Sequence, residues 1–180
     1  MSWTNSKPVW DTFVGLLSPG PGEKILDVGA GKGAVAAGVY EASKGGEVYA
    51  VDPSEQQVTR MKKAFPAVRA SVAGAEKLPF ADSDFDKAYT TMALHHFTDL
   101  DKALGEIARV LKHGGTFVVL EVEPHSMLGR MFTFFGRLGG EHMNIMSEDQ
   151  LLSKLSAQGG FGESRLVKLG ARYLIQLKRN

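Results

Sequence analysis

The chain has 180 residues, 43% of them hydrophobic and 23% charged, and its 21 basic and 20 acidic side chains leave a net charge of +1. A chain of this size and composition fits a single domain over residues 1–180, and the balanced charge excludes a general electrostatic attraction to nucleic acid or anionic membranes. Because the sequence has no cysteine, disulfides, thiolate metal sites and a cysteine nucleophile are excluded, and we expect no metal site.

Apolar runs alternate with helical patterns along most of the chain, which predicts an α/β fold with a mostly parallel sheet. Two helices are expected to begin with capping boxes, at Ser54 with Gln57 and at Ser147 with Gln150. Strands are expected at residues 24–28, 47–51, 68–72, 85–92 and 116–123. Helices are expected at residues 6–17, 34–42, 54–65, 100–111 and 147–158.

The chain closes with two runs that alternate polar and apolar residues. These runs, Arg165–Leu169 and Arg172–Leu177, are separated by a Gly-Ala pair, which favours an antiparallel hairpin. At the other end of the sequence, the first residues lack the apolar core of a secretory signal. No window approaches the roughly 20 apolar residues of a membrane-spanning helix. We therefore expect a cytoplasmic protein.

A glycine-rich turn follows the first expected strand, in the stretch ILDVGAGKGAVAAG of residues 25–38. Gly29, Gly31 and Ala34 match the dinucleotide fingerprint G-x-G-x-x-G/A, and Asp52 lies far enough downstream to bind ribose hydroxyls. On this interpretation the protein is a nicotinamide oxidoreductase. The chain is short for that function, which needs two mononucleotide-binding halves and a catalytic segment.

The same turn also fits an acidic residue followed by glycines at every second position, Asp27–Gly33. A pyrophosphate is attracted to a helix N-terminus, and the carboxylate of Asp27 beside that terminus would repel it. A cationic ligand reverses the sign of this interaction. S-adenosylmethionine carries an ammonium and a sulfonium and no phosphate, so the turn favours it as the cofactor. Close packing of strand and helix is the alternative, purely structural explanation of the glycines.

Four stretches between about Lys24 and Glu123 occur in the order that one enzyme family shows. They read LDVGAGKG, VYAVDPSEQ, AGAEKLPFADSDFDKAYTTMALHHFTD and EIARVLKHGGTFVVLEVEP. With these motifs the chain resembles the class I S-adenosylmethionine-dependent methyltransferases, and within them the small-molecule branch that includes the quinone-biosynthesis C-methyltransferases. The resemblance implies a Rossmann-like, doubly wound, seven-stranded sheet that is mostly parallel with an antiparallel C-terminal strand.

The resemblance also implies which residues bind the cofactor. Asp27 is expected to face the ammonium group, and Asp52 to accept hydrogen bonds from both ribose hydroxyls. The backbone of the turn is expected to approach the methionine part, and the residue after Asp52 to pack beside the adenine. The residues that complete this part of the site are Gly29, Ala30, Gly31, Gly33 and Pro53.

Further cofactor contacts are implied after the third and fourth expected strands. Gly74, Ala75 and Glu76 lie where relatives contact the adenine. Many relatives carry Asp or Asn at the position of Gly74, so adenine recognition in this chain is expected to rely on the main chain. Thr91 and Met92 match positions near the cofactor and the methyl-transfer face.

Two histidines, His95 and His96, follow the fourth expected strand, where the open end of the sheet lies. One of them is expected to face the pocket, either as a general base or as a group that shapes the cofactor site. His125 and His142 are further candidates. Methylation of pyrimidine ring carbons and of arsenic requires cysteine and is excluded. The TTMA sequence also lacks the Asn/Asp-Pro-Pro-aromatic tetrad that is typical of enzymes that methylate glutamine or the exocyclic amino groups of nucleobases.

The segment of residues 124–146, rich in Met, Phe, Gly and Arg, follows the fifth expected strand, where enzymes of this kind vary. We expect it to cover an apolar substrate. Arg130 and Arg137 would share one helical face, which suits an anionic group on the substrate or simple solvation, and docking at a membrane surface is a third possibility. Trp10 and Phe13 of the first helix are expected to pack on the sheet or to cover the same pocket.

These observations predict an enzyme that transfers a methyl group from S-adenosylmethionine to a small, partly apolar acceptor. The expected partners are the small-molecule substrate and, in one interpretation, a membrane surface, with no nucleic acid. A protein methyltransferase and a catalytically inactive cofactor-binding scaffold are alternatives, and an NAD-dependent oxidoreductase is a less favoured one.

Overall fold

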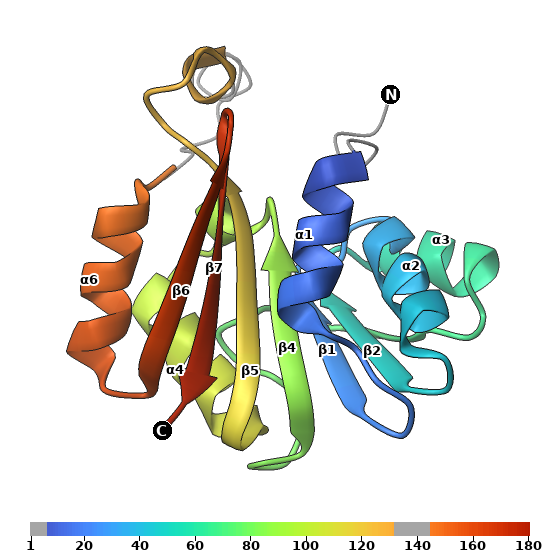
Figure 1. The fold of residues 1–180 in the computed structure, drawn as a ribbon. Helices are drawn as coiled ribbons and strands as arrows, with labels where there is room; N and C mark the ends of the chain where they lie inside the picture. Colours follow the sequence, from blue (N-terminus) through green and yellow to red (C-terminus); the bar gives the residue numbers. More distant parts are fainter. Residues whose placement is uncertain (1–6, 132–144) are drawn as a thin grey trace.

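The computed structural model describes residues 7–131 and 145–180. Its strands are β1 Lys24–Val28, β2 Glu47–Asp52, β3 Arg69–Val72, β4 Phe85–Thr91, β5 Leu111–Val122, β6 Phe161–Leu169 and β7 Arg172–Arg179. Its helices are α1 Lys7–Leu17, α2 Ala34–Ser43, α3 Glu55–Ala64, the 3-10 helix η2 Leu94–His96, α4 Leu100–Val110 and α6 Glu148–Gln158. The seven strands form one sheet in the order β3-β2-β1-β4-β5-β7-β6 (Figure 1).

The direction of the strands agrees with the sequence-based expectation. β1 pairs in parallel with β2 and β4, and parallel pairing continues outward to β3 and β5. β7 lies between β5 and β6 and is antiparallel to both. The predicted Rossmann-like α/β fold, with a mostly parallel sheet and an antiparallel C-terminal strand, is therefore confirmed.

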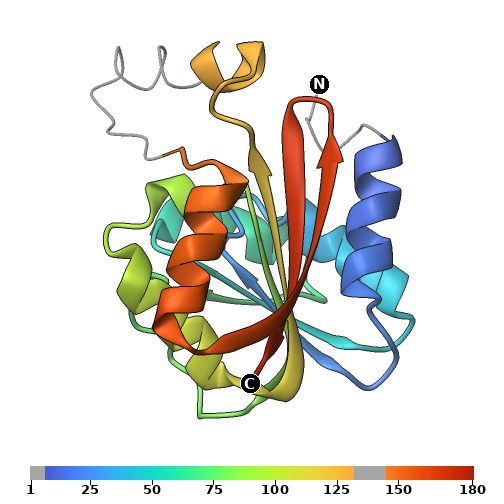
Figure 2. The same cartoon turned by 60° about the vertical axis from the view of Figure 1, so that its left-hand side comes forward.

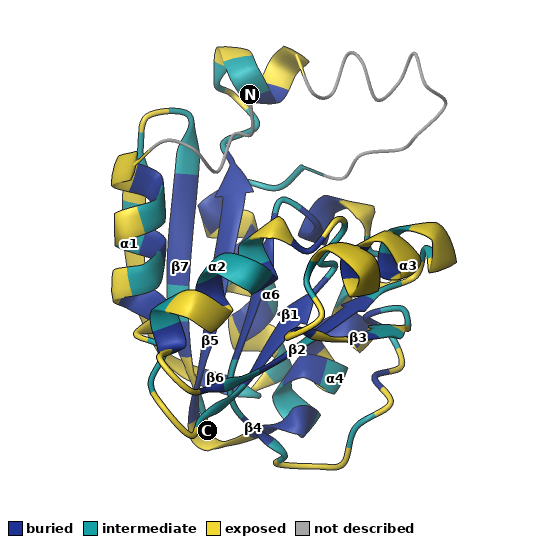
Figure 3. Cartoon of the chain, turned by 90° about the vertical axis from the view of Figure 1, so that its right-hand side faces the viewer, coloured by how far each residue is buried: buried dark blue, intermediate teal, exposed yellow. Residues whose placement is uncertain are grey.

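Helices cover both faces of this sheet. Apolar side chains of α1, α2 and α3 pack against one face, and those of α4 and α6 pack against the other. Figures 1 and 2 show the two layers on opposite sides, and Figure 3 shows the central strands buried between them. In the part of the chain that the structure describes, no helix has both the length and the apolar character needed to cross a bilayer.

Side-chain caps fix where the helices begin. The Ser147 hydroxyl accepts a hydrogen bond from the Gln150 N–H, and the Gln150 side chain accepts one from the Ser147 N–H at 3.0 Å, so this predicted capping box is confirmed. Asp99 is the N-cap residue of α4, and its carboxylate caps that helix as the Ser147 hydroxyl caps α6. Each cap satisfies an N–H group that the first helical turn would otherwise leave without a partner.

The capping box predicted for α3 forms only in part. The Ser54 hydroxyl accepts a hydrogen bond from the Gln57 N–H, as expected. The Ser54 N–H, however, donates to Oδ1 of Asp52 at 2.9 Å, so the side chain of Gln57 is not used in the cap. The nearby carboxylate replaces the glutamine because a charged acceptor forms the stronger hydrogen bond.

Two strands begin earlier than the sequence pattern indicates. Leu111, predicted as the end of a helix, is instead the first residue of β5 and pairs with Phe85. β6 begins at Phe161 rather than Arg165, and the Phe161 ring stacks on Phe117 with centroids 5.5 Å apart. Tertiary packing thus extends both strands beyond their regular alternation of polar and apolar residues.

The segment after β5 is described only at its ends. Residues 127–131 are helical, and the Met127 side chain in this helix is 90% exposed. Arg137 and His142 lie outside the described residues. The expectation that residues 124–146 cover the substrate therefore stays a prediction.

Candidate functional site

A cleft lies where the order of the sheet reverses. β2 lies on one side of β1 and β4 on the other, so the loops that follow β1 and β4 diverge at the carboxyl ends of the strands. The cleft between them has a volume of about 590 Å³. Its lining consists of Gly29, Gly31, Asp52, Pro53, Ser54, Gln57, Ala73, Gly74, Ala75, Glu76, Met92, Ala93, His96, Phe97 and Thr98.

Two glycines of the turn after β1 leave no room for a side chain. Gly29 has a φ of +82°, and a Cβ atom there would lie 2.5 Å from the Cβ of Ala93. Gly33 has a φ of +80°, and a Cβ atom there would lie 2.3 Å from the Cγ of Met61. Both glycines therefore allow close packing of the turn, and the backbone of Gly31 between them borders the cleft.

Asp52, at the end of β2, connects this turn to α3. Its Oδ2 accepts a hydrogen bond from the Gly31 N–H at 2.8 Å, and its Oδ1 accepts one from the Ser54 N–H at 2.9 Å. The side chain is half-buried and lines the cleft. Because a carboxylate offers about four acceptor positions, Asp52 can also bind hydroxyl groups of a ligand.

Gln57 provides a second acceptor in the cleft. Its Oε1 is buried, and no described residue donates a hydrogen bond to it. A buried amide oxygen without a partner costs free energy, which a donor group on a ligand would recover. The sequence pattern assigned this side chain to a helix cap, so its place in the cleft was missed.

Gly74, Ala75 and Glu76 form the opposite wall of the cleft. Oε1 of Glu76 accepts hydrogen bonds from the N–H groups of Thr98 at 2.8 Å and of Asp99 at 3.2 Å, which connects the loop after β3 to the loop after β4. A Cβ atom at Gly74 would lie 2.9 Å from Oε2 of Glu76. A side chain at this position would therefore require the Glu76 carboxylate to move.

Asp27 lies in β1 below the turn and is not part of the cleft lining. It is fully buried and pairs in register with Tyr89 of β4. No described residue forms a well-oriented hydrogen bond with either oxygen of its carboxyl group. Burial raises the pKa of Asp27 to about 8, and the charge of Asp52 adds to the rise, while the Tyr89 hydroxyl opposes it. Burial therefore favours the protonated form of the Asp27 carboxyl group in the folded protein.

A comparison with known families matches residues 26–119, more than half of the chain, to the family described as the methyltransferase domain. The chain belongs to this family. The sequence-based resemblance is thereby confirmed.

Individual methyltransferases are similar to this chain in sequence or in fold. The ubiquinone/menaquinone biosynthesis C-methyltransferase UbiE of Bordetella avium is 37% identical over 119 residues, which are 63% of this chain and 46% of the relative. The chain thus spans about half the length of that relative. The solved structure of the S-adenosylmethionine-dependent methyltransferase of Mesorhizobium loti matches this chain with a TM-score of 0.83 at 19% identity. The match covers 97% of this chain and 99% of that enzyme's chain.

A second solved structure has the same fold. It is the geranyl diphosphate C-methyltransferase of Streptomyces coelicolor A3(2), in complex with Mg²⁺, geranyl diphosphate and S-adenosyl-L-homocysteine. Its TM-score is 0.80 at 16% identity, and the match covers 96% of this chain and 79% of that enzyme. At this identity the likeness establishes the fold of the methyltransferase domain and nothing finer.

The two candidate histidines of the methyltransferase domain occupy different environments. His95 is buried, and its Nδ1 lies 3.0 and 3.1 Å from the two carboxylate oxygens of Glu121. Glu121 also accepts a hydrogen bond from the Leu94 N–H at 3.0 Å. His96 is exposed and lines the cleft, with its ring centroid 4.3 Å from that of His95. Of the two, His96 is therefore the histidine placed at the cleft.

Sequence reasoning did not identify Glu121 as a site residue. A signal existed, because Glu121 is an acidic residue within the apolar run TFVVLEVE, which predicts a buried strand. A charged residue in such a strand is buried only when partners satisfy it, and Glu121 is 3% exposed.

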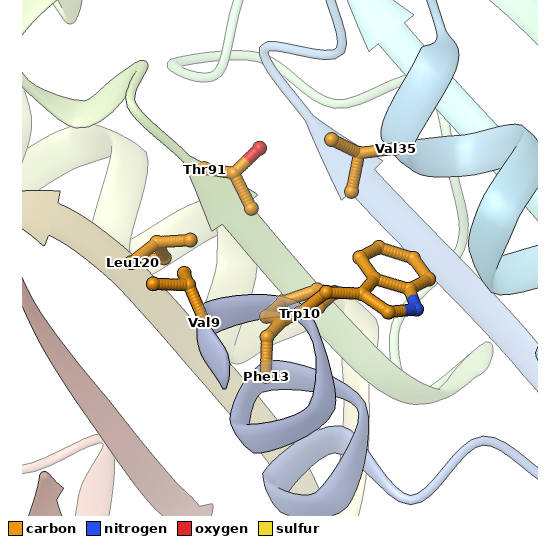
Figure 4. Close-up of a pocket in the computed structure, with 6 residues that line it drawn as sticks. All are labelled: Val9, Trp10, Phe13, Val35, Thr91 and Leu120. Atoms are coloured by element: carbon orange, nitrogen blue, oxygen red, sulfur yellow. The ribbon is translucent and has the colours of Figure 1, made fainter. Parts of the chain in front are cut away.

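The residues expected from the sequence fall into two groups. Those that line the cleft are Gly29, Gly31, Asp52, Pro53, Gly74, Ala75, Glu76, Met92 and His96. Those outside its lining are Asp27, Ala30, Gly33, Thr91 and His95. His125 is exposed in the loop after β5. Thr91 lines a separate small pocket under α1, together with Val9, Trp10, Phe13, Val35 and Leu120 (Figure 4).

Proposed function

We propose that this methyltransferase domain binds S-adenosylmethionine in the cleft after β1 and β4 and transfers its methyl group to a small, partly apolar acceptor. The observation that carries the proposal is the position of Asp52, whose carboxylate lines the cleft while its oxygens hold the glycine turn and the start of α3. Membership of the methyltransferase domain family supports the reaction.

The polar groups of the site fit this cofactor better than one that carries phosphates. Asp52 and the free Oε1 of Gln57 are hydrogen-bond acceptors, which suit ribose hydroxyls and an adenine amino group. α2 begins after Gly33 without a side-chain cap, so N–H groups of its first turn can bind the carboxylate of the methionine part. The buried carboxyl group of Asp27 below the turn gains a partner when an ammonium binds there.

The protein contributes mainly by aligning the reactants. When bound, S-adenosylmethionine supplies a methyl group on a positively charged sulfur, and its transfer needs no enzyme nucleophile. Asp52 and the turn fix the position of the donor, and Met92 and Phe97 give the cleft apolar walls. Such positioning can supply roughly 7 to 11 kcal/mol of the barrier reduction.

His96 is the histidine we assign to proton transfer. An acceptor that is a phenol or an acidic carbon must lose a proton as the new bond to the methyl carbon forms. His96 lines the cleft, whereas the Nδ1 of His95 is held by Glu121 in the buried layer beside it. His95 accordingly has a positioning role in this proposal, and His96 accepts the proton.

Calorimetric titration with S-adenosylmethionine, S-adenosylhomocysteine and NAD tests the choice of cofactor. We expect the first two to bind at one site and NAD to show no saturable binding. Saturable binding of NAD without binding of S-adenosylmethionine would replace the proposal with the oxidoreductase alternative.

Turnover separates the remaining alternatives. S-adenosylhomocysteine should accumulate when the protein is incubated with S-adenosylmethionine and a set of small phenols and quinols. Methylation of proteins but not of these small molecules would indicate a protein methyltransferase. Binding of S-adenosylhomocysteine without turnover on either class would indicate an inactive scaffold.

We further expect a small-molecule partner, no nucleic acid, a cytoplasmic location and a single domain over residues 1–180. Peripheral membrane contact is supported by the exposure of Met127 and Met131 on the helical residues 127–131. Sedimentation with vesicles of neutral and anionic lipid would detect such contact.

A further inference from the structure

Glu76 places one of its two carboxylate oxygens beside a glycine in the wall of the cleft. Both Glu76 and Gly74 line the cleft. A Cβ atom at Gly74 would lie 2.9 Å from Oε2 of Glu76. The Glu76 carboxylate therefore lies next to the space that a side chain at position 74 would fill.

The two oxygens of this carboxylate have different surroundings. Oε1 accepts hydrogen bonds from the N–H groups of Thr98 at 2.8 Å and of Asp99 at 3.2 Å. Among residues 7–131 and 145–180, no group donates a hydrogen bond to Oε2 of Glu76, and this oxygen is not buried. A carboxylate oxygen with free lone pairs can accept a hydrogen bond from a ligand in the cleft.

The backbone around Glu76 fixes the direction of its side chain. The N–H of Lys77 donates to the carbonyl of Gly74 at 3.3 Å, which closes a short turn that contains Glu76. The bonds from Thr98 and Asp99 hold the Oε1 end of the carboxylate against the loop after β4. Because the carboxylate is a rigid plane, these contacts also restrict the position of Oε2. A ligand therefore meets an acceptor that is already in place, which lowers the entropy cost of binding.

The position of Asp52 determines which part of the cofactor reaches this wall. In the proposed function the Asp52 carboxylate binds the ribose, and the methionine part lies at the turn of Gly29 and Gly31. The ribose is the middle of S-adenosylmethionine, so the adenine extends away from the turn, toward the wall that Gly74 and Glu76 form. The 6-amino group of adenine is a hydrogen-bond donor, and a carboxylate oxygen is a strong acceptor for it.

Gln57 offers the other candidate acceptor for this amino group. Its Oε1 is buried, so a ligand reaches it only if the side chain turns. Oε2 of Glu76 requires no such movement. As a charged acceptor it also forms the stronger hydrogen bond. Glu76 is therefore the better acceptor for the amino group.

We propose that Oε2 of Glu76 accepts a hydrogen bond from the 6-amino group of the cofactor's adenine and thereby selects this base. The sequence predicts recognition by the main chain here, because Gly74 has no side chain. In the structure, the absence of a side chain at Gly74 leaves room for the Glu76 carboxylate. This inference rests on the proposed function and adds a specificity-determining contact to it.

Binding of two paired ligands, measured by calorimetry, tests the inference. They are S-adenosylhomocysteine and its analogue in which hydrogen replaces the 6-amino group. The wild-type protein should bind S-adenosylhomocysteine on the order of tenfold more tightly than the analogue, since a hydrogen bond to a charged group has about that effect.

Glu76→Gln should bind the two ligands about equally. The amide oxygen of the new side chain takes over the bonds from the Thr98 and Asp99 N–H groups, so its NH₂ group faces the base. A donor then meets the donor group of adenine. Turning the amide does not help, because its NH₂ group would then face the two N–H groups.

Gly74→Ala tests the same contact without removal of the carboxylate, and it keeps the proposal testable if Glu76→Gln does not fold. Its Cβ atom would displace Oε2 of Glu76, so the preference for S-adenosylhomocysteine over the analogue should shrink. Glu41→Gln is the matched control, because Glu41 is an exposed glutamate of α2. It should keep the wild-type preference.

Three results would overturn the assignment. They are equal affinities of the two ligands for the wild-type protein, an unchanged preference in Glu76→Gln, and loss of the preference in Gln57→Met but not in Glu76→Gln. The third result would assign the amino group to Gln57. If S-adenosylhomocysteine fails to bind the wild-type protein, the proposed function is wrong. If it binds but the analogue binds equally well, only the role of Glu76 is wrong.

Discussion

Oδ2 of Asp52 accepts a hydrogen bond from the N–H of Gly31 at 2.8 Å, so the end of β2 is joined directly to the glycine turn after β1. The two residues are far enough apart in sequence that only the parallel pairing of β1 with β2 brings them together. A ligand bound by the Asp52 carboxylate is therefore also held against the turn.

Replacement of Asp52 by alanine should weaken the binding of S-adenosylmethionine by about tenfold or more, because a carboxylate that accepts two hydroxyl groups contributes about 1.5 to 3 kcal/mol. The fold should stay intact, since the backbone pairing of β2 does not use this side chain. Calorimetric titration measures the affinity, and circular dichroism checks the fold. Asp11→Ala, which removes an exposed carboxylate of α1, should bind as the wild-type protein does. Unchanged affinity in Asp52→Ala would refute the ribose assignment.

The raised pKa of Asp27 predicts a specific dependence of stability on pH. In the unfolded chain this carboxyl group titrates near 3.8, whereas burial raises its pKa in the folded protein to about 8. Between these values the folded state binds more protons than the unfolded state, so the free energy of unfolding should fall as pH rises from about 4 to about 8 and then level off. Urea denaturation at several pH values should show this slope, and Asp27→Asn should make it less steep. An equal slope in Asp27→Asn would contradict the assignment.

The same pKa predicts that cofactor binding releases a proton. A cation near Asp27 favours the ionised form, so binding at pH 7 should expel the proton that the free protein holds there. The affinity for S-adenosylmethionine should therefore increase as pH approaches 8. Calorimetry in two buffers of different ionisation enthalpy measures the proton count, and Asp27→Asn should reduce that count. Besides burial, the hydroxyl of Tyr89 lowers the pKa of Asp27 and the charge of Asp52 raises it.

The buried contact between His95 and Glu121 should contribute to stability. Removal of the imidazole in His95→Ala would leave a buried carboxylate with fewer partners, and we expect a loss of about 3 kcal/mol in the free energy of unfolding. A double-mutant cycle with Glu121→Gln should show a coupling of at least about 0.5 kcal/mol. His125→Ala, which changes an exposed histidine, serves as the control. Additive effects of the two substitutions would mean that the contact is not energetically significant.

Gly33→Ala should destabilise the protein more than Gly22→Ala. Both glycines have positive φ values, +80° and +74°, but a Cβ at Gly33 would clash with Met61, whereas a Cβ at Gly22 meets no atom within 4 Å. The two variants share the backbone strain, so the difference between their free energies of unfolding measures the clash with Met61. We expect this difference to be about 1 to 3 kcal/mol, as measured by urea denaturation. Similar losses in both variants would show that Met61 moves aside without cost.

Much of the fold follows from local patterns in the sequence. The buried runs of β1, β2 and β4 and the caps at Ser147 and Ser54 are short-range signals, and the structure places the elements where these signals do. Boundaries differ where distant packing decides them, as at Phe161, which joins β6 because its ring stacks on Phe117. Hydrophobic periodicity carries no information on such contacts.

The site is predictable where a sequence motif determines the local backbone conformation. The turn at Gly29 and Gly31 and the carboxylate of Asp52 belong to motifs that imply their place, and all three line the cleft. The side chain of Gln57 was not predictable, because the carboxylate of Asp52 displaces it from the helix cap. The contact between His95 and Glu121 likewise joins the loop after β4 to β5, which the sequence of either element leaves open.

A crystal structure of the protein with S-adenosylhomocysteine tests the central claim most directly. We expect density in the cleft, with the ribose hydroxyls within hydrogen-bond distance of Asp52 and the amino group at the turn above Asp27. Density for this ligand elsewhere, or a ribose that faces away from Asp52, would contradict it.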